Sequence, residues 1–160
     1  MLDITAADRI AIHETIALHG HVADDREWDR WGELYSDDLV LDLEDFGLGT
    51  TRGIAALQKM ARDKQDDPAQ PLGHHVTNIV LVAHDGDRVR ARSKGLAVNA
   101  DGTSGTVVYE DTLRREPQGW RICHRKVLAR RAPVNSPPDS GAESNTTPTS
   151  SEPGLPTRVT

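Results

Sequence analysis

The sequence predicts an α+β domain in which helices pack on one face of an antiparallel sheet. Three observations lead to this fold class. Apolar residues recur at helical spacing in the first part of the chain, up to about residue 65. From residue 74 onward they alternate with polar residues, which is typical of strands with one buried face. Turn signals such as Asp85-Gly86 separate these strands, so consecutive segments are expected to form an antiparallel meander.

The N-terminal part is expected to form three helices. The first begins at Thr5, whose hydroxyl can cap a helix with Asp8 in its first turn, and ends near residues 20–23. The second begins at Asp24 or Asp25. Its apolar face is formed by four residues, Trp28, Trp31, Leu34 and Tyr35. The apolar face of the third helix is formed by Ile54, Leu57, Met60 and Ala61.

The remaining elements are expected to be strands. Leucine alternates with Val40 and Asp42 over residues 39–43, which predicts a first strand, and residues 44–53 are expected to form a loop. Four more strands are predicted at residues 74–83, 88–95, 106–115 and 120–131. In the segment 88–95, small and apolar residues alternate with four basic residues. The basic side of this strand is therefore expected to face solvent.

Composition sets the domain limits and argues against some functions. Residues 3–132 are expected to form one folded domain of the 160-residue chain. The Pro/Ser/Thr-rich tail, residues 133–160, has too few apolar residues to form a core and is expected to be disordered. The net charge of −6 argues against nucleic acid as a partner. The single cysteine, Cys123, excludes an internal disulfide and fits a reducing compartment.

The sequence also bears on partners and localisation. No apolar run reaches membrane-spanning length and no signal-peptide core is visible, so we expect a cytoplasmic protein without a membrane partner. Motifs for nucleotide and metallo-hydrolase sites are missing, so neither a cofactor nor a metal is expected. A homodimer is expected through the sheet face that the helices leave open, although the basic row of Arg88, Arg90 and Arg92 would need acidic partners there.

The stretch LHGHVADD, residues 18–25, concentrates two histidines and two aspartates. A metal site is disfavoured, because His19 and His21 point to different sides of a helix and too few ligands remain. Asp24 with Glu27 has the spacing of a helix cap with its capping-box partner, which would be a structural role. The alternative is one wall of an acid–base site, because a carboxylate in apolar surroundings can take part in proton transfer.

Several motifs in succession resemble a known family. They are DDREWDRWGELYSDD at residues 24–38, HHVTN at 74–78, VVYEDTLRR at 107–115 and GWRICHR at 119–125. Together they are similar to the SnoaL-like group of the nuclear transport factor 2-like superfamily. The resemblance implies a cone-shaped, curved antiparallel sheet whose concave face is covered by three N-terminal helices around a deep, mostly apolar pocket. The superfamily includes polyketide cyclases, dehydratases, ketosteroid-type isomerases, small epoxide hydrolases, and members that only bind or dimerise.

The resemblance also implies site residues. Relatives with dehydratase chemistry often carry a tyrosine and, five residues later, an aspartate near the end of the first helix. Asp24 matches the aspartate, while His19 stands in place of the tyrosine. A strand histidine followed by an asparagine four residues later corresponds to His74 and Asn78, and a basic residue on the final strand corresponds to Arg125.

The residues themselves leave some roles open. His74 and His75 are adjacent in a strand, so only one can face a pocket, and parity with Asn78 favours His74 unless a bulge intervenes. Tyr109 is expected either to bind a substrate oxygen or to be a core tyrosine. Arg125 is expected either to bind an anionic group or to form a salt bridge.

These residues predict a cofactor-independent acid–base enzyme, a dehydratase, isomerase or cyclase, acting on a small apolar oxygenated molecule such as a polyketide or steroid-like compound. The expected catalytic residues are Asp24, His19 and one of His74 and His75, with Asn78, Tyr109 and Arg125 binding substrate. One alternative is an epoxide hydrolase that holds its water with Asp24, Arg125 and Asn78. Another is a binding or dimerisation module without catalysis.

Overall fold

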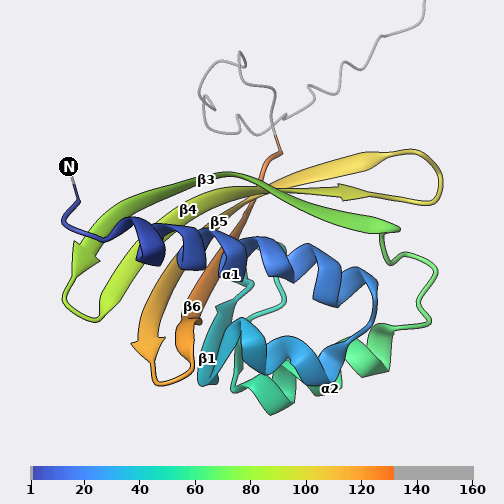
Figure 1. Cartoon of the computed structure of the whole chain (residues 1–160). Helices are drawn as coiled ribbons and strands as arrows, with labels where there is room; N and C mark the ends of the chain where they lie inside the picture. The colour runs from blue at the N-terminus through green and yellow to red at the C-terminus, as the bar shows by residue number, and fades with distance from the viewer. Residues whose placement is uncertain (1, 132–160) are drawn as a thin grey trace, which may run out of the picture.

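The computed structural model of the chain describes residues 2–131 (Figure 1). These residues form an α+β unit whose helices lie on one side of a curved, open sheet, so the predicted fold class is confirmed. The predicted disordered tail, residues 133–160, lies outside the described residues. None of the helices within residues 2–131 has both the length and the apolar character needed to cross a membrane.

Six strands form the sheet, in the order β2-β1-β6-β5-β4-β3. The meander is antiparallel and consists of β3 (Gly73–Asp85), β4 (Arg88–Val98), β5 (Ser104–Glu116) and β6 (Gly119–Ala129). Two shorter strands, β1 (Tyr35–Asp42) and β2 (Thr50–Arg52), extend the sheet beyond β6. In contrast to the antiparallel sheet expected, β1 runs parallel to β6. Parallel pairing is possible because a long connection, through β2 to β5, separates the two strands.

Two helices cover the concave face of the sheet. The N-terminal helix α1 (Ala6–Asp24) is capped by Thr5, whose hydroxyl accepts a hydrogen bond from the Asp8 backbone N–H at 3.1 Å. Its Ile12 and Ile16 are completely buried. The helix α2 (Ile54–Lys64) lies on the same side of the sheet, and its Leu57 is buried (Figure 1). The apolar core therefore lies between these helices and the inner side of the strands.

The second predicted helix differs from the expectation. Only a short 3-10 helix, η1 (Trp28–Glu33), forms there, because Arg26 adopts a left-handed backbone with φ of 56° and ends the α-helical path. Three residues per turn then bring Trp28 and Trp31 to the same side, with ring centres 5.2 Å apart. Tyr35, expected on the helix, is instead the first residue of β1. The predicted loop 44–53 contains a further 3-10 turn, η2 (Glu44–Phe46), and the edge strand β2.

A β-bulge interrupts β3 in the middle. Asn78 has φ of 53°, and the register with β4 shifts between Thr77 and Val80. Thr77 and Asn78 are consequently both exposed in succession, while Ile79 packs against the core. The parity expected to place Asn78 beside His74 is therefore wrong, because the extra residue turns Asn78 to the outer face of the sheet.

Candidate active site

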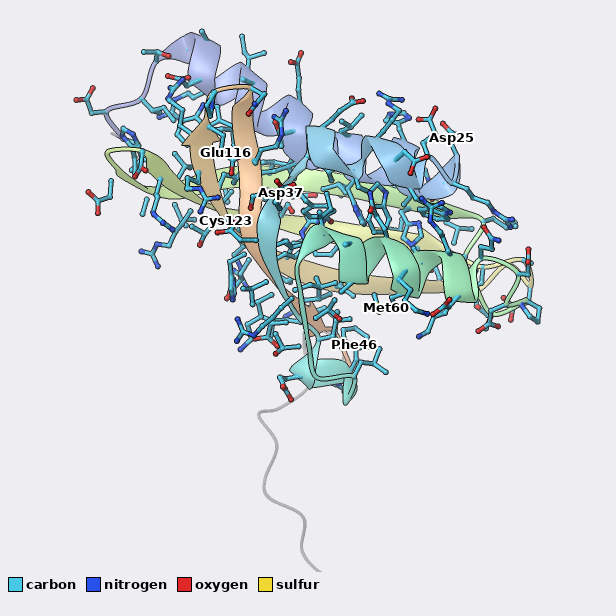
Figure 2. The ribbon with its side chains drawn as sticks, turned by 90° about the horizontal axis from the view of Figure 1, so that it is seen from below. Asp25, Asp37, Phe46, Met60, Glu116 and Cys123 are labelled. Atoms are coloured by element: carbon cyan, nitrogen blue, oxygen red, sulfur yellow. The ribbon has the colours of Figure 1, made fainter. Side chains whose placement is uncertain are left out.

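A cavity of about 470 Å³ opens between the helices and the concave face of the sheet. Its walls are mostly apolar, and the side chains that form them come from η1, β1, α2 and β6: Trp28, Trp31, Leu41, Leu57, Met60 and Val127. In the view from below, Met60 lies on α2 and Asp25 lies at the end of α1, the two helices beside the cavity (Figure 2). Polar groups gather where α1 meets the strands: His19, Asp24, Tyr35, His74, Tyr109 and Arg125.

Asp24 and His74 form a carboxylate–imidazole pair at the mouth of this cavity. The Asp24 carboxylate accepts a hydrogen bond from the His74 backbone N–H at 2.9 Å and lies 2.6 Å from His74 Nδ1. Asp24 is the last residue of α1 and its carboxylate reaches across to β3, so Asp24 does not form the helix cap that was one of its two possible roles. The pair is not enclosed in apolar surroundings either, because the Asp24 and His74 side chains keep 27% and 29% of their surface exposed.

Gly20 explains why α1 comes so close to β3. A Cβ atom at this position would overlap the His74 carbonyl oxygen, so only glycine allows the helix to lie directly on the strand. Gly20 is one helical turn before Asp24 and adjacent to His19. Gly20 therefore allows both His19 and Asp24 to approach His74.

A second set of polar side chains lies deeper in the site and forms an inner hydrogen-bond network of Asp111, Arg125, Tyr35 and His19. Asp111 accepts two hydrogen bonds from the Arg125 guanidinium, from Nε at 2.7 Å and from Nη2 at 2.9 Å. The third guanidinium nitrogen, Nη1, donates to the Tyr35 hydroxyl oxygen at 3.0 Å. The Tyr35 hydroxyl in turn lies 3.1 Å from His19 Nδ1. Arg125 therefore forms the buried salt bridge that was one of its two expected roles and contacts Tyr35 rather than projecting alone into the cavity.

Burial and nearby charges determine which side chains of this inner network carry a proton. Burial lowers the pKa of His19 well below its ordinary value of 6.5, and the positive charge of Arg125 and the proximity of His74 lower it further. Burial raises the pKa of Tyr35 to about 12, so the phenol keeps its proton. Burial likewise raises the pKa of Tyr109. The inner end of the site thus contains one ion pair, Arg125 with Asp111, and the neutral hydrogen-bonding groups of Tyr35, Tyr109 and His19 around it.

Tyr109 belongs both to the core and to the cavity wall. It is 7% exposed, and its ring lies beside the Arg125 guanidinium carbon, 4.4 Å from ring centre to carbon. Gly95 on β4 makes room for this ring, because a Cβ there would come within 2.7 Å of it. The Tyr109 and His19 ring centres are 5.8 Å apart. Tyr109 therefore packs against the inner network at Arg125 and His19, and it also lines the cavity.

Two of the predicted site residues lie elsewhere. His75 is exposed, is not part of the cavity lining and pairs with the exposed Leu96 on β4. Asn78 lies on the outer face with Arg92 and Lys94, as the bulge requires. The structure thus brings together Asp24, His19, His74, Tyr109 and Arg125, and leaves His75 and Asn78 outside.

Three contributors to the site were not expected from the sequence. Tyr35 was assigned to a helix face, and Asp111 was given no role in the site. Trp31, counted as a core residue of the second helix, also lines the cavity. Burial does not alternate over residues 35–38, where Tyr35 and Ser36 are both buried and Asp37 and Asp38 are both exposed, so only the leucines of residues 39–43 signalled β1 in the sequence.

Comparisons with known proteins agree with this architecture. The model of the SnoaL-like domain family matches residues 5–126. No curated protein matches the sequence. A nuclear transport factor 2-like protein with a cystatin-like fold from Novosphingobium aromaticivorans is 25% identical, with a TM-score of 0.66 over 80% of this chain and 85% of its own.

Two further solved structures are similar in fold. A candidate scytalone dehydratase from Novosphingobium aromaticivorans is 17% identical, with a TM-score of 0.65 over 86% of this chain and 96% of its own. The protein Aln2 from a Streptomyces species is 18% identical, with a TM-score of 0.64 over 81% of this chain and 94% of its own. At these identities the similarity concerns the fold. Because the family model spans most of the described residues, this chain belongs to the SnoaL-like family.

Proposed function

We propose that this protein is an acid–base enzyme in which the Asp24–His74 pair removes a proton from carbon, next to a carbonyl group, in a small apolar oxygenated substrate. Dehydration, isomerisation and intramolecular cyclisation share this step. The observation that carries the proposal is the carboxylate–imidazole pair at the mouth of an apolar cavity, with 2.6 Å between Asp24 Oδ1 and His74 Nδ1.

The pairing fixes which nitrogen of His74 acts as the base. A carboxylate can only accept hydrogen bonds, so the proton of the neutral ring resides on Nδ1 and is donated to Asp24. The lone pair is then on Nε2, which has no hydrogen-bond partner among the described residues. Asp24 also stabilises the imidazolium that forms when Nε2 takes up a proton.

The cavity favours a small, largely apolar substrate. The perpendicular indole rings of Trp28 and Trp31 form part of one wall, and the aliphatic side chains of Leu57 and Met60 form part of another. The volume of about 470 Å³ is within the range of sites for small molecules. A polyketide or steroid-like ketone fits this description, and a structural relative described as a candidate scytalone dehydratase supports the dehydratase variant of the proposal.

The geometry does not favour epoxide hydrolysis. The trio expected to hold the water was Asp24, Arg125 and Asn78. Asn78 lies on the outer face of the sheet, and all three guanidinium nitrogens of Arg125 bond to Asp111 or Tyr35. These residues therefore do not converge on one water molecule.

Proton exchange provides a test that does not depend on knowing the substrate. α-Tetralone, a bicyclic aromatic ketone, exchanges its α-protons for deuterium when a base removes them in heavy water, and NMR follows the exchange. Asp24→Asn removes the carboxylate with little change in shape. We expect it to slow the protein-catalysed exchange by about a hundredfold or more, with the thermal midpoint unchanged.

The neighbouring Asp25→Asn variant is the matched control, because Asp25 is exposed and outside the cavity lining. It should exchange at the wild-type rate. Equal rates in Asp24→Asn and in the wild type would refute the role of the pair. A β-hydroxy ketone on the same ring system then distinguishes dehydration, which releases water, from exchange alone.

A further inference from the structure

We propose that Arg125, acting through Tyr35, holds His19 neutral with its proton on Nε2, and that His19 is thereby the hydrogen-bond donor that binds the substrate oxygen opposite the His74 base. The catalytic role of the His19 N–H rests on the proposed function above. The arrangement of protons is a property of the resting protein.

The first step is the fixed orientation of Arg125. Its side chain and that of Asp111 are 1% and 0% exposed, and two parallel hydrogen bonds join them. A guanidinium has donors only, so the Tyr35 oxygen must accept the bond from Nη1. Arg125 is therefore a positioning residue that determines the direction of the Tyr35 hydroxyl.

The second step is the direction of the next hydrogen bond. With its oxygen accepting from Arg125, the Tyr35 hydroxyl can use its own proton to donate to His19 Nδ1, at 3.1 Å. A nitrogen that accepts carries no proton, so a neutral His19 has its proton on Nε2. His19 lines the cavity, and its Nε2 has no hydrogen-bond partner among residues 2–131.

The third step is that His19 stays neutral. The titratable groups packed around it are Tyr35 on β1, His74 on β3, Tyr109 on β5 and Arg125 on β6. The two carboxylates of the site, Asp24 and Asp111, are bound to His74 and Arg125 respectively, so neither is left to stabilise a charged His19. Burial and the Arg125 charge lower the pKa of His19, in agreement with this geometry.

The two histidines therefore offer complementary groups to one substrate. His74 presents a lone pair and His19 presents an N–H, with ring centres 5.9 Å apart. His74 Nε2 takes the proton from the α-carbon, the electron pair of the broken C–H bond forms the C=C bond, and the π pair of the carbonyl moves to its oxygen to give an enolate. The neutral His19 N–H binds this oxygen without giving up its proton, which stabilises the developing negative charge. The site is thus specific for a ligand whose oxygen accepts a hydrogen bond next to an acidic C–H.

Nitrogen-15 NMR of the histidine side chains tests this proton arrangement without any substrate. In the wild type we expect His19 to be neutral at pH 7 and to stay neutral as the pH falls below 6.5. Its proton should be on Nε2, and its unprotonated Nδ1 should resonate upfield of an unprotonated ring nitrogen that accepts no hydrogen bond. In Tyr35→Phe the Nδ1 resonance should move downfield, because the hydroxyl donor is lost. Tyr109→Phe is the matched control and should leave it in place, because the Tyr109 hydroxyl is not bonded to His19.

A proton on Nδ1, or a charged His19 at pH 7, would overturn the proposal, and the wild type alone suffices to reveal either. An unchanged Nδ1 resonance in folded Tyr35→Phe would also overturn it. The exchange assay on the same samples separates the two proposals. A wild type with the expected His19 signals but no exchange would refute the proposed function and leave the proton arrangement standing.

Discussion

Glu110 and Asp111 are neighbours on β5, yet they form ion pairs of opposite character on the two faces of the sheet. On the inner face, Asp111 binds Arg125 through two hydrogen bonds of 2.7 and 2.9 Å, and both side chains are buried. On the outer face, Glu110 lies 3.7 Å from Arg92, and these side chains are 49% and 55% exposed. The same chemical pair is thus part of a rigid site on one face and a loose surface contact on the other.

Burial determines whether a charged side chain in this fold constrains its neighbours. A buried pair loses its hydration, so it persists only with near-ideal geometry and it fixes the groups around it, here Tyr35 and His19. The exposed pair keeps its hydration and constrains little. The outer face also carries Arg90 and Lys94, both exposed, and a homodimer through this face stays a prediction.

Removing the arginine of each ion pair in turn should produce the largest difference between the two faces. Arg125→Met leaves the Asp111 carboxylate buried and unpaired, which is expected to lower the free energy of unfolding by about 3–5 kcal/mol. The matched variant Arg92→Met on the outer face should cost less than about 1 kcal/mol. Urea unfolding at constant pH measures both losses.

Equal losses in the two variants would contradict the comparison. The double variant Arg125→Met/Asp111→Leu sharpens it, because it removes both buried charges. We expect it to regain most of the lost stability. Its Tyr35 hydroxyl would nevertheless lack the guanidinium donor, so stability and the hydrogen-bond geometry at His19 become separable.

A smaller effect is expected from pH, because His19 is buried as a neutral group. Its pKa is lower in the folded protein than the 6.5 of the unfolded chain, so below pH 6.5 the unfolded state binds a proton that the folded state does not. Stability is therefore retained above pH 6.5 and lost as pH falls below it. Relative to His19→Gln, the wild type should lose about 1.4 kcal/mol for each pH unit.

Urea titrations of both proteins between pH 7 and about pH 5 measure this difference. Parallel stability curves would show that His19 gains a proton as easily in the folded protein as in the unfolded chain. That result would contradict the contrast between the buried inner face and the hydrated outer face.

Much of the fold could be predicted because local patterns agree with it. The alternation of Val89, Ala91 and Ser93 with basic residues placed the faces of β4 correctly, since all three are buried. The Asp85-Gly86 turn fixed the hairpin between β3 and β4, where Gly86 has a positive φ. Such signals depend on residues close in sequence, which a single chain displays directly.

The rest depends on contacts between distant segments. The bulge at Asn78 reverses strand parity without a glycine or proline to announce it. The hydrogen bonds between Asp24 and His74 join residues that are 50 positions apart in the sequence. They depend on Gly20, which allows α1 to touch β3. Arg125 could be singled out, but its partner Asp111 becomes evident only once β5 and β6 are aligned.

His74 and His75 provide the most direct test of the proposed base, because they are adjacent on β3 and only His74 lines the cavity. The measurement is the rate of α-proton exchange of α-tetralone in heavy water for His74→Gln and His75→Gln. If His74 is the base, His74→Gln should lower the rate by about a hundredfold or more, while His75→Gln keeps the wild-type rate. An equal loss in both variants, or full activity in His74→Gln, would contradict this role of His74.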